Sequence, residues 1–320
     1  MRQWAVLFLG MSILLAFNAY GQHYPNRAVR VIVPLPPGGA TDVIIRPLAQ
    51  KLGEAMGQTF FIDQRAGGGQ IIGTDLAAKS KPDGYTLLLV SVTHSTNPSL
   101  YTKLPYDSVK DFTAVSLLAS SALVLLVHPS LPAKSVKELI ALARINPSGL
   151  NYASGGNGSG GHLAAELFKS MARVNLTHIP YKGGGLAYVD LVAGQVPIMF
   201  TSPAATRGFV KSGRLRALAT TGTSRAKATP ELPTVSEAAL PGFEANLWYG
   251  MLAPASTAQD IVLRLNSEIV KALQHSDLRD QYLEAGVEPT QSMPEQFRAY
   301  IEREIAKWSK VIKAANIRTG

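Results

Sequence analysis

The segment RVIVPLPPGGATD, residues 30–42, contains the pattern that decides the fold of this chain. Its apolar residues 31–33 are typical of a buried strand, the prolines and glycines end that strand, and residues 43–56 have the spacing of an amphipathic helix. The elements expected next are a strand at 59–63, a turn at Gly67–Gly69, a helix at 72–79 and a strand at 85–90. This alternation predicts an α/β fold with a mostly parallel sheet.

A second series of strands and helices begins at Phe112 and predicts a second lobe of similar build. It opens with a long β-rich segment, residues 114–127. The elements expected after it are a helix at 135–145, a strand at 150–153, a helix at 162–172, a strand at 176–180, a helix at 186–193 and strands at 196–200 and 216–220. From Ser256 onward the pattern is helical, because apolar side chains recur every three or four residues and predict faces that pack on the core.

The first residues predict the compartment. A short positive start, Met1-Arg2-Gln3, precedes an uncharged apolar run from Trp4 to Phe17, and Ala19 and Gly21 place small residues where a signal peptidase cleaves. The run is shorter than the roughly 20 apolar residues that span a bilayer. Residues 1–21 are therefore expected to be a cleaved secretory signal peptide, and the mature chain to be exported and free of the membrane.

Charge and cysteine content narrow the classes of partner. The chain has 31 Lys and Arg against 22 Asp and Glu, a formal charge of +9, and no cysteine. The absence of cysteine excludes disulfides, thiolate metal sites, a catalytic thiol and a lipidated N-terminal cysteine. The basic charge admits nucleic acid, an anionic membrane surface or small anions. Export and the scattered placement of the basic residues argue against nucleic acid as a partner.

Four glycine-rich turns connect a predicted strand to a predicted helix. They lie at residues 34–42, 65–73, 154–162 and 181–185. The first turn of a helix has unpaired backbone N–H groups that attract anions, and glycine lets a ligand approach the backbone closely. Several such turns facing one cleft would bind a carboxylate or phosphate without an arginine. The alternative is that the glycines only connect strands to helices.

The motifs of enzymes and of cofactor sites are missing or incomplete. Residues 156–161 satisfy G-x-G-x-x-G, but the strand at 176–180 lacks the acidic residue of a dinucleotide site. There is no P-loop, no G-x-S-x-G, and no spacing of the six histidines that suits a metal. Asp42 and Asp190 lie early in helices, where a carboxylate favours the helix dipole. We therefore expect no catalytic residue, no metal and no cofactor, with a periplasmic enzyme as the alternative.

A series of motifs in chain order resembles one family, the Bug-type periplasmic solute receptors of tripartite tricarboxylate transporters. The matching segments are YPNR (24–27), VPLPPGGATD (33–42), PDGYTLL (82–88), HSTNPSLY (94–101), YASGGNGS (152–159), HIPYKG (178–183), LRALA (215–219), PTVSE (233–237) and PGFE (241–244). They extend over essentially the whole mature chain.

The resemblance implies a two-lobed type II periplasmic binding protein fold with a ligand cleft between the lobes. The chain would cross between lobes near residues 116–127 and 243–253. Lobe one would then comprise residues 22–122 and 245–320, and lobe two residues 123–244.

The same resemblance implies a monomeric receptor that captures a small carboxylate: a dicarboxylate, a tricarboxylate, an acidic amino acid or an aromatic acid. Its partners would be the membrane permease subunits of the transporter. The alternative is the same binding module acting as the ligand sensor of a membrane kinase. Backbone N–H groups, hydroxyls and water at the glycine turns would hold the carboxylate. The residues assigned to this site are Gly38, Gly39, Ala40, Thr41, Asp42, Thr93, Ser154, Gly155, Asn157, Gly158, Ser159, His162, Lys182, Gly183, Gly184 and Ser202.

Overall fold

The computed structural model describes residues 24–37, 40–146, 149–227 and 229–317, so the expected signal peptide at 1–21 lies outside the described residues. In chain order the elements are β1 (Val29–Val33), α2 (Ala40–Met56), β2 (Phe60–Gln64), η1 (Gly68–Gln70), α3 (Ile71–Ala78), β3 (Thr86–Ser91), α4 (Thr93–Leu100), β4 (Phe112–Ser121), β5 (Val124–Val127), α5 (Val136–Ile145), β6 (Leu150–Ser154), α6 (Gly160–Ala172), β7 (Leu176–Pro180), α7 (Gly184–Val192), β8 (Ile198–Thr201), α8 (Pro203–Lys211), β9 (Arg216–Thr220), α9 (Val235–Ala238), β10 (Leu247–Pro254), α10 (Gln259–Gln274), α11 (Ser276–Glu284), β11 (Glu288–Pro289) and α12 (Pro294–Ala314).

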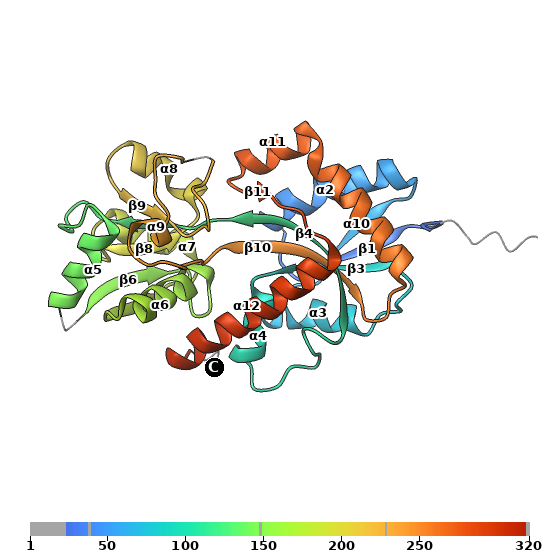
Figure 1. Cartoon of the computed structure of the whole chain (residues 1–320), viewed down its shortest axis with the longest axis horizontal. Coiled ribbons are helices and arrows are strands. Elements are labelled where there is room, and N and C mark those ends of the chain that lie inside the picture. The colour runs from blue at the N-terminus through green and yellow to red at the C-terminus, as the bar shows by residue number, and fades with distance from the viewer. Residues whose placement is uncertain (1–23, 38–39, 147–148, 228, 318–320) are drawn as a thin grey trace, which may run out of the picture.

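Two sheets form the centres of two lobes (Figure 1). The six-stranded sheet of lobe one has the order β11-β4-β10-β3-β1-β2, and the five-stranded sheet of lobe two has the order β7-β6-β8-β5-β9. In the described part of the chain, no helix is both long and apolar enough to cross a bilayer.

Both sheets are mixed, and the expectation of a mostly parallel sheet was wrong. In lobe one β1 pairs in parallel with β2 and β3, whereas β10 pairs antiparallel with β3 and β4. In lobe two β6 pairs in parallel with β7 and β8, whereas β5 pairs antiparallel with β8 and β9. The antiparallel strands are those next to the two crossings, where the chain enters a sheet from the other lobe.

The long β-rich segment expected at 114–127 divides between the lobes. β4 ends at Ser121 in the first sheet, and β5 begins at Val124 in the second. The return crossing enters β10, which starts at Leu247. The two long strands β4 and β10 lie side by side in opposite directions and connect the two lobes (Figure 1).

Each lobe has an apolar core that its sequence pattern explains. In lobe one the buried faces of α2 and α10 pack against the sheet, with Ile45, Leu48 and Leu265 fully buried. In lobe two Leu163 and Phe168 of α6 are buried against its sheet. These side chains follow the three-and-four-residue spacing of amphipathic helices, so burial in both lobes is distributed along continuous helix faces.

The C-terminal helix α12 belongs to lobe one but reaches lobe two. It contacts α4 and β4 of lobe one and α6 of lobe two. Its buried Glu304 accepts hydrogen bonds from the indole N–H groups of Trp248 on β10, at 3.2 Å, and of Trp308, at 2.9 Å, and it pairs with Lys307. A buried carboxylate with three donors is satisfied electrostatically, and it ties α12 to the start of β10.

Candidate functional site

The carboxyl ends of the parallel strands in the two lobes face each other across the crossings. Ser91, the last residue of β3, lies at the same end of its sheet as Ser121, where β4 leaves lobe one. Val124, the first residue of β5, pairs with Thr201, the last residue of β8. The helices that follow these strands, α2, α3 and α4 in lobe one and α6, α7 and α8 in lobe two, therefore begin toward the space between the lobes. The N–H groups of helix first turns have no partner within the helix, so such ends make that space attractive to anions.

Two of the expected turns in lobe two are joined into one surface. Residues Ser154–Ser159, here called the lobe-two glycine turn, follow β6, and Tyr181–Gly184 follow β7. The Tyr181 N–H donates to the Ser154 carbonyl at 3.0 Å, and the Gly183 N–H donates to the Gly155 carbonyl at 3.2 Å. The structure thus brings the predicted residues of both segments together.

Glycine is required within the lobe-two glycine turn. Gly156 and Gly158 have φ angles of 124° and 73°, a region that side chains disfavour. A Cβ at Gly158 would also lie 3.2 Å from the Leu100 side chain at the end of α4. The turn therefore packs against lobe one at this point.

The two serines of this turn have different partners. The Ser154 side chain is fully buried, and its Oγ accepts the Gly156 N–H at 3.1 Å. Ser159 is the N-cap of α6, and its side chain accepts the His162 N–H at 3.4 Å. Ser154 therefore stabilises the turn from its buried side. Any effect of Ser154 on ligand affinity is transmitted through the backbone of the turn.

Two stacked histidines lie against the buried side of the turn. The rings of His162 on α6 and His178 on β7 are 3.8 Å apart between centroids and 10° from parallel. His178 also stacks on Tyr152 of β6, at 4.9 Å. His178 Nε2 is 2.6 Å from Ser154 Oγ, and the Gly158 N–H donates to His162 Nδ1 at 3.0 Å.

Both imidazoles are uncharged at neutral pH. Burial, together with the nearby His178 and Lys169, lowers the pKa of His162 to about 3. Burial is also the main reason that the pKa of His178 is lowered, although Glu166 opposes that effect. The contact of 3.9 Å between His162 Nε2 and Glu166 Oε1 is therefore not an ion pair at pH 7.

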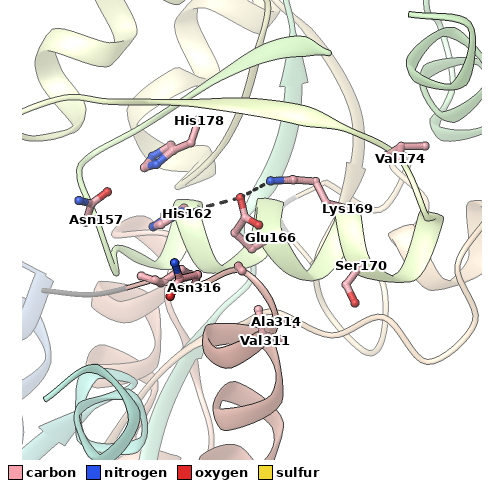
Figure 2. A pocket seen from close by; sticks show the side chains of 12 residues that line it. Asn157, His162, Glu166, Lys169, Ser170, Val174, His178, Val311, Ala314 and Asn316 are labelled. Atoms are coloured by element: carbon pink, nitrogen blue, oxygen red, sulfur yellow. Dashed lines mark hydrogen bonds and ion pairs between the residues drawn. The ribbon is translucent and has the colours of Figure 1, made fainter. Parts of the chain in front are cut away.

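A pocket of about 700 Å³ opens beside the histidines (Figure 2). Its walls come from α6, from β7 and from the end of α12, so both lobes contribute to it. Asn157 and His162 of the predicted site line it. Glu166 and Lys169 line it as well, and Lys169 Nζ lies 2.7 Å from Glu166 Oε1. Glu166 also accepts the Tyr152 hydroxyl at 2.6 Å, and burial together with this carboxylate raises the pKa of that tyrosine.

The lobe-one glycine turn, Gly67–Gln70, is supported by side chains that do not titrate. Asn97 of α4 donates to the Gly69 carbonyl at 2.9 Å, and the Ser91 hydroxyl donates to the Gln70 side chain at 3.2 Å. The Thr74 hydroxyl donates to the Gln70 carbonyl at 2.8 Å.

The remaining predicted site residues have varied positions. Gly38 and Gly39 lie outside the described residues, and Ala40 begins α2. Thr41 is buried, and Asp42 accepts from Gln64 at 3.0 Å and pairs with Arg46 at 3.4 Å. Thr93 is the first residue of α4, Ser202 is the N-cap of α8, and Lys182 is exposed beside Gly183. Among the described residues, no group of three or more His, Asp or Glu side chains could hold a metal ion.

Two residues that support the turns were missed among the predicted site residues. Asn97 and His178 both stand inside motifs that were quoted for the resemblance, yet neither was assigned to the site. The detectable signal was a polar residue inside an otherwise buried segment: Asn97 is 1% exposed within α4. His178 gives no such signal, because its position opposite Tyr152 follows from strand register.

Comparison with known proteins agrees with the two-lobed fold. The model of a family described as "Tripartite tricarboxylate transporter family receptor" matches residues 44–317. Three solved structures are similar: R. palustris Rpa4515 with adipate is 37% identical with a TM-score of 0.76, and covers 92% of this chain and 100% of its own. The periplasmic binding protein BugD is 31% identical with a TM-score of 0.73, covering 92% and 100%. MatC (Rpa3494) from Rhodopseudomonas palustris with bound malate is 31% identical with a TM-score of 0.71, covering 90% and 100%.

Proposed function

The chain belongs to the tripartite tricarboxylate transporter receptor family, and we propose that it captures a small dicarboxylate between its lobes in the periplasm and delivers it to a transporter of that type. One observation carries the proposal: the carboxyl ends of the parallel strands of both lobes, with six helix N-termini after them, face the same space. Two structures of similar proteins contain adipate and malate, which are both dicarboxylates. A dicarboxylate would place one anionic group against each lobe.

The predicted site residues fit this binding mode. The lobe-two glycine turn and the neighbouring segment Tyr181–Gly184 offer backbone N–H groups and the exposed Lys182 to one carboxylate. The start of α2 and the lobe-one glycine turn would offer N–H groups to the other. A charge-assisted hydrogen bond contributes about 1.5–3 kcal/mol, so three or four support micromolar affinity after the cost of association.

Two further features belong to the proposal. The lobe boundaries would lie at 122/123 and 244/245, which agrees with the strands of each sheet: β4 ends at Ser121 and β10 begins at Leu247. The permease subunits of the transporter would be the membrane partners of a monomeric receptor, and the signal peptide at 1–21 would direct export. The receptor would bind its ligand and release it unchanged, without a cofactor.

A thermal-shift screen over adipate, malate, citrate, aspartate and benzoate tests the function. A ligand at 100 times its Kd stabilises the folded protein by about 2.7 kcal/mol through mass action. We expect one of the dicarboxylates to give the largest shift and its dimethyl ester, which lacks the charges, to give none. Calorimetry then measures Kd, and small-angle scattering checks that the ligand reduces the radius of gyration as the lobes close.

The outcomes separate the alternatives. Equal shifts with the acid and its ester would exclude recognition of carboxylates, and turnover of the ligand would indicate an enzyme. A shift by benzoate alone would replace the dicarboxylate with an aromatic acid.

A further inference from the structure

The stacked histidines contact the lobe-two glycine turn at two points. His178 Nε2 meets the buried hydroxyl of Ser154, and His162 Nδ1 accepts the N–H of Gly158. Ser154 Oγ in turn accepts the N–H of Gly156. The imidazole pair therefore holds three residues of this turn. Ser154 and Gly158 are bonded directly, and Gly156 is bonded through Ser154.

The contact with Gly158 requires one protonation state. An N–H group can donate to Nδ1 only if that nitrogen carries a lone pair, so the proton of neutral His162 is on Nε2. Adding a second proton would place N–H against N–H and break this hydrogen bond. It would also put a charge 3.8 Å from the stacked ring of His178, in a buried site.

The surroundings of the pair give an added charge little net stabilisation, because the effect of Glu166 on His178 is outweighed by burial. The titratable groups that face it are Tyr152 from β6 and Glu166 and Lys169 from α6, and the last two neutralise each other. The residues of the α12 end that line the adjoining pocket are Val311, Ala314, Ala315, Asn316 and Ile317, none of which titrates. Figure 2 shows both rings beside this pocket, through which water can supply a proton.

We propose that His162 and His178 are positioning residues that hold the lobe-two glycine turn in its ligand-binding form, and that they do so only while His162 is uncharged, so that acid releases the turn and weakens binding. This proposal rests on the proposed function, because it assumes that the turn binds the carboxylate. The histidines act through Ser154 and the backbone of the turn, and neither needs to touch the ligand.

The direction of the pH effect follows from proton linkage. The pKa of His162 in the ordered turn, about 3, is below its ordinary value of 6.5. The released turn therefore binds more protons than the ordered turn, and the ordered form loses stability as the pH falls from 6.5 toward 3. Below 6.5 the order of the turn weakens by up to about tenfold per pH unit for each proton taken up.

Two substitutions at His178 separate its hydrogen bond from its stacking. His178→Phe keeps a ring on His162 but loses the contact with Ser154. His178→Gln keeps a nitrogen the same number of bonds from the backbone as Nε2 and does not titrate. His162→Asn likewise keeps an acceptor at the position of Nδ1. The double variant His162→Asn/His178→Gln therefore keeps both hydrogen bonds without an ionisable group.

The test measures hydrogen–deuterium protection factors of the Gly156 and Gly158 amides in the ligand-free protein. In the wild type we expect protection to fall about tenfold between pH 7 and pH 5. At pH 7 the protection factors of these amides should fall about tenfold in His178→Phe and less than threefold in His178→Gln. The double variant should show no change with pH. His128→Phe, at a histidine paired with Ser130 far from the turn, is the matched control and should match the wild type.

Calorimetry with adipate is the second readout. We expect His178→Phe to raise Kd about tenfold at pH 7 and the double variant to bind with less pH dependence than the wild type. Comparison at equal pH cancels the titration of adipate itself. Wild-type protection in a folded His178→Phe protein, or wild-type pH dependence in the double variant, overturns the proposal. If no carboxylate binds the wild type, the proposed function fails, and the amide protection still decides the role of the histidines.

Discussion

The two lobes hold similar glycine turns by different chemistry. In lobe one the turn Gly67–Gln70 is supported by Asn97, Ser91 and Thr74, whose amide and hydroxyl groups keep their charge state at any physiological pH. In lobe two the turn Ser154–Ser159 is supported by an imidazole pair. Both lobes have a glycine turn, but protonation can alter the supporting side chains of the lobe-two turn only. Because only the lobe-two turn is supported by titratable side chains, a change in pH can alter ligand affinity through that turn without changing the fold.

The largest expected effect is on the free energy of unfolding, at two glycines that allow a helix to pack closely against its neighbours. A Cβ at Gly161 of α6 would overlap the carbonyl oxygen of Phe200, and a Cβ at Gly73 of α3 would lie 2.7 Å from the Arg65 carbonyl oxygen. We expect Gly161→Ala to lower the free energy of unfolding by about 3 kcal/mol and Gly73→Ala by about 2 kcal/mol, because backbone cannot move away cheaply. Urea denaturation measures both.

Gly185→Ala is the matched control for this pair. A Cβ there meets nothing within 4 Å, and the residue lies inside α7, so alanine should leave stability unchanged or raise it. Equal stability of all three variants would show that the two helix starts are not tightly packed.

A second prediction compares one kind of ion pair in the two lobes. Lys169 and Glu166 of α6 are both mostly buried, whereas Lys79 at the C-cap of α3 is 66% exposed and pairs with the partly buried Asp75 at the same distance of 2.7 Å. Lys169→Met should cost about 2 kcal/mol, because it deprives the buried Glu166 of a charged donor. Lys79→Met should cost about 0.3 kcal/mol or less. Midpoints of thermal unfolding at equal ionic strength distinguish the two, and a similar loss for both would remove the contrast between the lobes.

A further prediction concerns ligand binding at Asn97. Asn97→Ala removes the donor to the Gly69 carbonyl and should weaken adipate binding about fivefold, which corresponds to about 1 kcal/mol. Since an amide does not titrate, the factor should be the same at pH 7 and pH 5, unlike the factor for His178→Phe. Calorimetry at the two pH values checks this, and a pH-dependent factor would mean that the supports of the two turns are coupled.

Most elements could be predicted from the sequence because they have strong local signals. The strand at 31–33 with its glycine turn and helix appears as β1 and α2, and the strand expected at 216–220 matches β9. The helix α4 was missed because Pro98 and its polar residues Ser95–Asn97 do not resemble a buried helix. Those polar side chains are buried because they bond backbone, a reason that exists only in three dimensions. For α8 a signal was present: Ser202-Pro203 is a common helix start.

The candidate site was less predictable than the fold. The glycine turns can be found from composition, but their supports depend on strand register and helix packing. His178 reaches Ser154 because β6 and β7 pair with Tyr152 opposite His178. The mixed sheets were mispredicted for a related reason: β10 and β5 pair with strands distant in sequence, where the chain has changed lobes.

The buried Glu304 has an optical consequence. Two of the three tryptophans of the chain, Trp248 and Trp308, donate their indole N–H groups to this one carboxylate, beside the strand that carries the chain back from lobe two. The third, Trp4, belongs to the segment expected to be removed on export. The emission of the mature protein therefore comes from two indoles that share one anionic acceptor at the crossing, so a shift of α12 against β10 is recorded in the intrinsic fluorescence without any added label.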